Sequence, residues 1–212
     1  MREELHIPVG KVVLPGDLEL PDSAQAIVVF AHGSGSSRNS PRNRQVAATL
    51  RRAGAMGTLL FDLLTPSEDA VYANRFDIEL LAERLEAATR YLLGLSGFAG
   101  IPVGLFGAST GAAAAIVAAV DLPHAVRSIV SRGGRPDLAG DALEALGIPT
   151  LLIVGGDDTQ VIGLNEQALA RIPAAEKRLE LVPGATHLFE EPGTLDAAAE
   201  LARDWFDRFL LA

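Results

Sequence analysis

The chain has 212 residues, of which 49% are hydrophobic and none is cysteine, and its formal net charge is −9. The absence of cysteine excludes disulfides, thiolate metal sites and a cysteine nucleophile, and the acidic balance argues against binding to nucleic acid. No apolar run approaches the roughly 18 residues of a membrane span, and residues 1–8 lack a secretory core, so we expect a cytoplasmic protein that does not enter a membrane. A chain of this length can bury roughly 70% of its unfolded surface, which is enough for one α/β domain.

Short apolar runs alternate with helical patterns along the chain. The dipeptide at Pro15 and Gly16 favours a turn between short strands at 9–14 and 17–20. The run Ala26–Ala31 is apolar throughout, which is typical of a strand buried on both faces of a parallel sheet. Further strands are expected at 56–61, 101–106, 126–130, 149–154 and 179–182, and helices at 41–53, 75–93, 112–120, 138–146, 161–171 and 194–211. This alternation predicts a doubly wound, mainly parallel sheet forming a single domain over residues 1–212.

A G-x-S-x-G motif occupies residues 107–111, between a predicted strand and an alanine-rich helix. A serine at such a sharp strand-to-helix turn is held in a strained conformation with its hydroxyl exposed above the sheet. The first N–H groups of the helix point to the same place and favour developing negative charge. Ser109 is therefore the candidate nucleophile.

Polar residues that follow two later strands supply the partners that this serine needs. Asp157 and Asp158 follow the strand at 149–154, and His187 follows the last strand. The order serine, acid, histidine is the one expected with a nucleophile at such an elbow. A histidine can accept the hydroxyl proton, and a carboxylate fixes its tautomer. We favour Asp158 as the acid because it directly precedes a helix, with Asp157 as the alternative.

An oxyanion hole requires two backbone donors close to the nucleophile. Thr110, the residue after the serine, provides one N–H group. Ser34, in the glycine-rich loop after the strand at 26–31, is the simplest source of the other. His32 begins this loop and is interpreted as a structural residue that orients it.

With these residues assigned, the chain resembles the α/β-hydrolase superfamily, and most closely the dienelactone hydrolase-like family. The matching segments occur in the same order over nearly the whole chain, at 32–38, 61–65, 107–111, 155–161 and 184–187. The resemblance implies hydrolysis of small esters or lactones without a metal or an organic cofactor. Dienelactone hydrolases proper have a cysteine nucleophile, so Ser109 indicates ordinary serine-esterase chemistry. Some relatives resemble a domain fused to phosphoribosyltransferases, which implies a metabolic partner.

Five arginines are expected near the edge of this site: Arg132 and Arg135 after the strand at 126–130, and Arg38, Arg42 and Arg44 after the oxyanion loop. No long insertion that could form a lid follows the strand at 126–130. Arg132, Arg135 and Arg38 are candidates for holding an anionic substrate, because a guanidinium pairs well with carboxylate or phosphate. The alternative for each of them is a surface ion pair with a neighbouring carboxylate.

Other functions remain compatible with the same residues. Acyl transfer and peptide hydrolysis use the same triad, since neither fold nor motif selects the acceptor. A non-catalytic binding or assembly domain on a hydrolase scaffold is a further alternative. Nucleotide binding is less favoured, because residues 104–111 lack the G-x-G-x-x-G spacing and no Walker lysine follows either glycine-rich loop.

Overall fold

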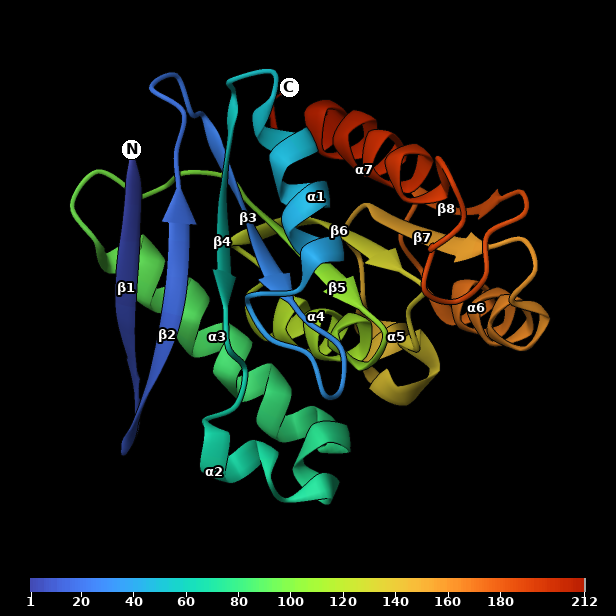
Figure 1. The fold of residues 1–212 in the computed structure, drawn as a ribbon, viewed down its shortest axis with the longest axis horizontal. Helices are drawn as coiled ribbons and strands as arrows, with labels where there is room; N and C mark the ends of the chain where they lie inside the picture. The colour runs from blue at the N-terminus through green and yellow to red at the C-terminus, as the bar shows by residue number, and fades with distance from the viewer. Residues whose placement is uncertain (212) are drawn as a thin grey trace.

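A computed structural model describes residues 1–211, which form one eight-stranded sheet with helices on both faces (Figure 1). The strand order is β1-β2-β4-β3-β5-β6-β7-β8. The first two strands pair in antiparallel fashion, β2 is antiparallel to β4, and the remaining neighbours are parallel. The strands are β1 (Arg2–Val9), β2 (Val12–Glu19), β3 (Ala26–Ala31), β4 (Met56–Phe61), β5 (Val103–Ala108), β6 (Val126–Arg132), β7 (Thr150–Gly155) and β8 (Lys177–Val182). The predicted fold class, a mainly parallel doubly wound sheet, is confirmed.

The central strands are buried on both faces, as their continuous apolar runs predict. Every residue of β3, β4, β5 and β7 is buried. Such strands need helices above and below them, because a sheet face left in water would lose its hydrophobic stabilisation. The α-helices are α1 (Pro41–Arg51), α2 (Pro66–Asp69), α3 (Ile78–Gly94), α4 (Thr110–Asp121), α5 (Ala142–Ala145), α6 (Thr159–Arg171) and α7 (Thr194–Leu210), and the 3₁₀ helices are η1 (Tyr72–Phe76) and η2 (Pro136–Ala139).

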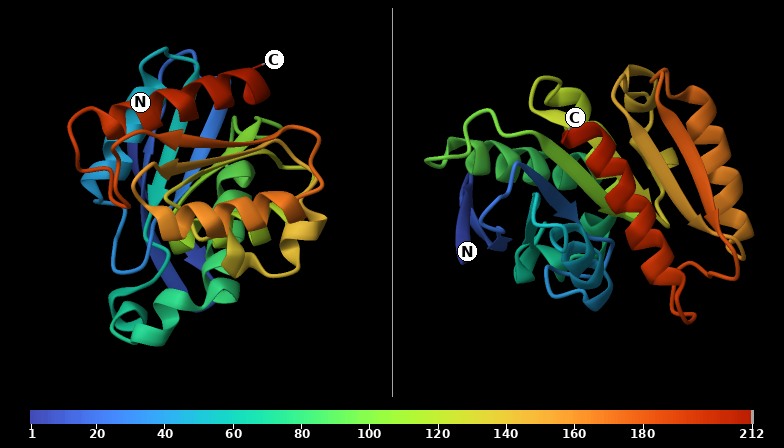
Figure 2. Two further views of the ribbon diagram at one scale, coloured as in Figure 1. Left: turned by 90° about the vertical axis from the view of Figure 1, so that its right-hand side faces the viewer. Right: turned by 90° about the horizontal axis from the view of Figure 1, so that it is seen from above.

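Two separate cores hold these layers together. Apolar side chains of α3, α4 and α6 pack on one face of the sheet, and those of α1 and α7 pack on the other. Figure 2 shows α7 and α6 on opposite sides of the strands β7 and β8. The carboxyl ends of the parallel strands are therefore left open between the helical layers, which is where sites form in open α/β sheets.

The predicted turn at Pro15 and Gly16 is wrong, because both residues lie inside β2. The chain turns instead between β1 and β2, where Gly10 has a φ of 57°. Gly16 is buried between Leu14 and Leu18, in the two-residue alternation of a half-buried strand. Pro15 is tolerated because β2 pairs with β4 only from Gly16 onward, so its missing N–H costs no bond on that side.

Helix boundaries differ from the prediction after β6, where the helix expected at 138–146 is replaced by η2 and the four-residue α5, and near the loop after β4. The segment 62–69, between the predicted strand at 56–61 and the predicted helix at 75–93, contains the short helix α2, whose Thr65 and Glu68 form a capping box. Helix α3 begins at Ile78 rather than at residue 75, because the side chain of Asp77 caps it by accepting from the Leu80 N–H. Only η2 and α5 connect β6 to β7, and no lid domain is inserted there in the part of the chain that the structure describes. Across residues 1–211, we find no helix with the length and apolar character to span a membrane.

Candidate active site

Ser109 lies at the sharp turn between β5 and α4. Its backbone has a φ of 52° and a ψ of −123°, outside the regions that non-glycine residues normally occupy. Such strain costs about 1–3 kcal/mol and persists only where the surroundings enforce it. Helix α4 begins at the next residue, so its positive end lies directly at the serine.

Glycines beside the serine enforce this turn by allowing close backbone contacts. A Cβ atom on Gly111 would lie 2.2 Å from the carbonyl oxygen of Ala31, and one on Gly107 would lie 2.4 Å from the Cα of Ala112. Neither distance is possible for a real side chain. The two glycines therefore let α4 pack directly on the end of β3 and fold back against β5, which is the structural reason for the G-x-S-x-G spacing.

His187 and Asp158 lie together at the carboxyl ends of the last two strands. The Nδ1 atom of His187 lies 2.7 Å from Oδ2 of Asp158, within hydrogen-bond distance. Asp158 is the residue before α6, whereas the exposed Asp157 makes only a backbone bond, from its N–H to the carbonyl of Ala185. A carboxylate only accepts, so Nδ1 donates and Nε2 is left with its lone pair free. The structure therefore pairs the imidazole with Asp158 and not with Asp157.

The loop that carries His187 is fixed on both sides of the imidazole. The carboxylate of Glu191 accepts from the backbone N–H of Thr186 at 3.0 Å and from its hydroxyl at 2.6 Å. These bonds lower the pKa of Glu191. Phe189 is buried and has a φ of 56°, unusual for an aromatic residue. This combination indicates a loop whose shape is set by packing rather than by its own preference.

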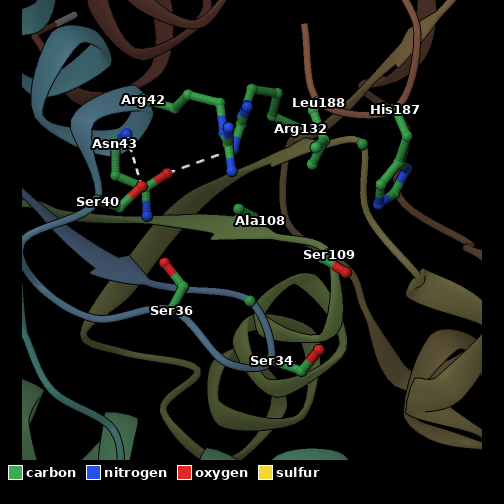
Figure 3. Close-up of a pocket in the computed structure, with 12 residues that line it drawn as sticks. Ser34, Ser36, Ser40, Arg42, Asn43, Ala108, Ser109, Arg132, His187 and Leu188 are labelled. Atoms are coloured by element: carbon green, nitrogen blue, oxygen red, sulfur yellow. Dashed lines mark hydrogen bonds between the residues drawn. The ribbon is translucent and has the colours of Figure 1, made fainter. Parts of the chain in front are cut away.

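Ser109 and His187 both line a cavity of about 270 Å³ at the carboxyl edge of the sheet (Figure 3). The structure gives no hydrogen bond between the Ser109 hydroxyl and the imidazole among residues 1–211. Catalytic hydrogen bonds are often long in unliganded enzymes and shorten when substrate binds. The cavity volume lies just below the roughly 300–1,000 Å³ range of small-molecule pockets, which fits a small ligand. Its lining consists of Gly33, Ser34, Ser36, Ser40, Arg42, Asn43, Ala108, Ser109, Arg132, Gly133, His187 and Leu188.

The loop expected to supply an oxyanion donor lies beside the nucleophile. A Cβ atom on Gly33 would lie 2.9 Å from the Cβ of Ser109, so the loop passes in direct contact with the serine. His32 holds the loop in place, because its Nδ1 lies 2.9 Å from the Gly33 carbonyl and its Nε2 accepts from the Leu63 N–H at 3.1 Å. Within the described chain, the N–H groups of Ser34 and Thr110 donate to no protein group.

The three arginines proposed from the sequence do not lie together. Arg38 lies outside the cavity and binds Asp62, with its Nη1 at 2.8 Å from Oδ2. Arg135 also lies outside it, held by two bonds of 2.8 and 2.9 Å to Asp137. Arg132 lines the cavity and is 7% exposed. Only Arg132 of the three can therefore face a ligand beside Ser109.

Sequence reasoning did not select several residues that line the cavity. Ser40 and Asn43 come from the start of α1, and Leu188 follows the histidine, whereas Arg42, expected near this edge, does line the cavity. The sequence predicted a helix starting at residue 41, but not which part of the fold the start of that helix faces. The start of α1 lies next to the end of β6 because of the strand order, which places residues far apart in the sequence at the same carboxyl edge of the sheet.

A search of solved structures gives a match over the whole fold. A dienelactone hydrolase from Anabaena variabilis superposes with a TM-score of 0.94, is 52% identical, and covers 99% of this chain and 98% of its own. The chain belongs to the dienelactone hydrolase-like family. The predicted family resemblance is thereby confirmed.

Solved structures of lower sequence identity also share the fold of this dienelactone hydrolase-like chain. Est1E from Butyrivibrio proteoclasticus has a TM-score of 0.80 at 14% identity, covering 97% of this chain and 98% of its own. An α/β serine hydrolase without a lid from Xanthomonas campestris has a TM-score of 0.78 at 18% identity, covering 100% of this chain and 96% of its own. At such identities these likenesses show the fold alone.

The curated relatives of this dienelactone hydrolase-like chain are named as transferases rather than as hydrolases. Proteins from two strains of Mycobacterium tuberculosis, each named "Putative phosphoribosyl transferase", are 59% identical over 204 residues. The match covers 96% of this chain but 46% of those proteins, so the chain spans about half the length of the curated relatives. No protein-family model matches the chain.

Proposed function

We propose that this chain is a serine hydrolase that cleaves a small ester or lactone through an acyl-enzyme on Ser109. The observation that carries the proposal is the hydrogen-bonded pair of His187 and Asp158, which lies at the cavity that also contains the strained serine. The likeness to a dienelactone hydrolase of solved structure supports the same chemistry.

In the proposed mechanism, His187 carries the proton between Ser109, the leaving group and water. Nε2 of His187 takes the Ser109 proton as Oγ attacks the ester carbonyl, and the imidazolium formed is stabilised by Asp158. The imidazolium then protonates the leaving alkoxide as its bond to the acyl carbon breaks. Water, deprotonated by the same imidazole, attacks the acyl-enzyme and releases the acid and the free serine.

The charge that develops on the carbonyl oxygen needs donors already in place. The N–H groups of Thr110 and Ser34 serve this role in the proposal, since one starts α4 and the other lies in the loop that touches Ser109. Loss of one such donor typically lowers the rate by about 10²–10³. The proposed mechanism uses protein groups and water only.

The proposal is tested by hydrolysis of p-nitrophenyl esters of varied chain length and charge. Ser109→Ala should lower kcat by on the order of 10⁶-fold. Ser96→Ala is the matched control, because Ser96 is exposed in the loop before β5, at the opposite end of that strand from the elbow. Equal activity of the Ser109→Ala protein and the wild type would refute a serine nucleophile at this position.

Acyl transfer and peptide hydrolysis remain alternative reactions of the same acyl-enzyme. Added alcohol or thiol acceptors distinguish transfer from hydrolysis, because a transferase forms the new ester in preference to the free acid. A binding or assembly domain without activity is the alternative from another class. It predicts no turnover of any ester and no reaction of Ser109 with acylating agents.

A further inference from the structure

Arg132 is a buried cation that lacks a carboxylate partner among the described residues. It ends β6, is 7% exposed, and forms no salt bridge within residues 1–211. Its one protein hydrogen bond is long, 3.4 Å from Nη2 to Oδ1 of Asn43, and its buried Nε has no partner. Burial of an unpaired charge is costly, so Arg132 would be stabilised by an anionic ligand in the adjoining cavity.

A second cation lies beside it instead of a carboxylate. Figure 3 shows the guanidinium groups of Arg42 and Arg132 approaching each other at the cavity, from α1 and from β6. Burial, followed by the positive charge of Arg42, lowers the pKa of Arg132 to about 10. It therefore remains charged at neutral pH. Within residues 1–211, Arg42 forms an ion pair only with the exposed Glu190, at 3.3 Å.

Other parts of the cavity reinforce this positive potential. The first turn of α1 contains no acidic residue and borders the cavity with Ser40, Arg42 and Asn43. The positive end of the helix dipole therefore adds to the two guanidinium charges. The guanidinium carbon of Arg132 lies over the ring of Phe189, 5.5 Å from the ring centroid, where a cation is attracted by the aromatic face.

We propose that Arg132, at the end of β6, and Arg42, at the start of α1, form a phosphate subsite. The substrate would then be a small ester or lactone that carries a phosphomonoester group. A phosphomonoester carries about −1.5 to −2 charges and three acceptor oxygens, which matches two guanidinium groups and a helix end. A carboxylate offers one charge and two oxygens and would leave part of this site unsatisfied. The assignment rests on the proposed function of Ser109 only for the ester part of the substrate.

Binding, rather than turnover, tests the subsite separately from the catalytic proposal. The Ser109→Ala protein is titrated by calorimetry with phenyl phosphate and with benzoate, at fixed ionic strength. We expect phenyl phosphate to bind at least about 10-fold more tightly, because the second charge is also paired. Equal affinity for the two probes, or no binding of phenyl phosphate, overturns the proposal even if the wild type hydrolyses neutral esters.

Substitutions in the same background assign the binding to these arginines. Arg132→Gln should weaken phenyl phosphate binding by about 10- to 100-fold, since it removes a charge-assisted bond in a buried site. Arg132→Lys should restore only part of this, because an ammonium lacks the planar fork. Arg44→Gln, on the same helix but paired with Asp17 outside the cavity, is the control and should change nothing. Unchanged affinity in the Arg132→Gln protein would overturn the assignment.

Thermal unfolding distinguishes a ligand-binding arginine from a structural one. Without phosphate, Arg132→Met should raise Tm, because it replaces an unpaired buried charge with an apolar side chain of similar length. Saturating phenyl phosphate should raise the Tm of the Ser109→Ala protein. It should not raise the Tm of the double variant that carries both Ser109→Ala and Arg132→Met. A lower Tm for Arg132→Met in both buffers would show a structural role and contradict the proposal.

Discussion

The carbonyl oxygen of Ala185 occupies the space in which a Cβ atom on Gly155 would lie, at a distance of 2.4 Å. The loop that carries His187 therefore packs directly on the last residue of β7. Three residues later the chain reaches Asp158, whose carboxylate binds the imidazole. This close contact between the loops that follow β7 and β8 places Asp158 and His187 side by side for the proposed chemistry.

Gly155→Ala should separate these loops and impair both stability and activity. The added methyl would also lie 2.6 Å from the Thr186 carbonyl, so backbone must move, at a cost of about 1–3 kcal/mol in the free energy of unfolding. A displacement of about 1 Å at the imidazole can lower kcat by about 100-fold. Gly163→Ala in α6 is the control, since within residues 1–211 its added methyl would meet open space beyond the backbone of its own helix. Urea unfolding and ester hydrolysis measure the two effects, and equal behaviour of the two variants would contradict the account.

The two neighbouring aspartates should differ sharply on substitution. Asp158→Asn removes the acceptor for the Nδ1 proton and should lower kcat by about 10⁴-fold through the wrong tautomer. Asp157→Asn should change kcat by less than about 3-fold, because its side chain is exposed and only its backbone contacts the histidine loop. Steady-state kinetics with one neutral ester decides between them. A larger loss for Asp157→Asn would reverse the assignment of the acid.

His32 should make stability depend on pH below neutrality. Burial lowers the pKa of His32 below its ordinary value of 6.5, despite opposing contributions from the Gly33 carbonyl and from Asp62 and Asp69. The unfolded chain therefore binds the proton first. The contribution of His32 is complete above pH 6.5 and is lost as the pH falls through the pKa of the folded state.

The slope of stability against pH measures this contribution. Between about pH 6.5 and 5.5, the free energy of unfolding should fall by up to about 1.4 kcal/mol more in the wild type than in His32→Gln. All other titrating groups are common to the two proteins, so the difference isolates this residue. Parallel slopes would show that His32 does not remain neutral in the folded protein.

Arg135→Gln should leave the selectivity for substrate charge unchanged. The Arg135 guanidinium is engaged by both oxygens of Asp137 and lies outside the cavity. The measurement is the ratio of kcat/KM for a phosphorylated and a neutral ester of the same size, which Arg132→Gln should reduce. A change of more than about 3-fold in the Arg135 variant would return this residue to the list of substrate-binding candidates.

Local sequence signals predicted the parallel strands and the elbow, but not β1, because they depend on short-range physics. Continuous burial of 26–31 and the glycine spacing around Ser109 are properties of a few adjacent residues. The turn at Pro15 was mispredicted because a dipeptide preference was given more weight than the alternation of Leu14, Gly16 and Leu18. That alternation, which is typical of a half-buried strand, was the signal that could have corrected it.

The arginines show what local signals could not supply. Arg38, Arg132 and Arg135 are equivalent in the sequence as residues of polar loops near strand ends. Their difference comes from distant partners, since Asp62 lies 24 positions from Arg38 and the α1 residue Asn43 lies 89 positions from Arg132. Which cation remains without a carboxylate is decided by strand order and helix direction. Only the three-dimensional arrangement singles out Arg132.

Mass spectrometry of the protein after treatment with a fluorophosphonate tests the central claim, a nucleophilic Ser109 activated by His187, most directly. In this reaction the serine oxygen displaces fluoride at phosphorus, and the imidazole takes the proton. We predict a single adduct on the peptide that contains Ser109, absent in Ser109→Ala and formed far more slowly in His187→Ala. An unmodified wild-type chain, or an adduct on another serine, would contradict the account.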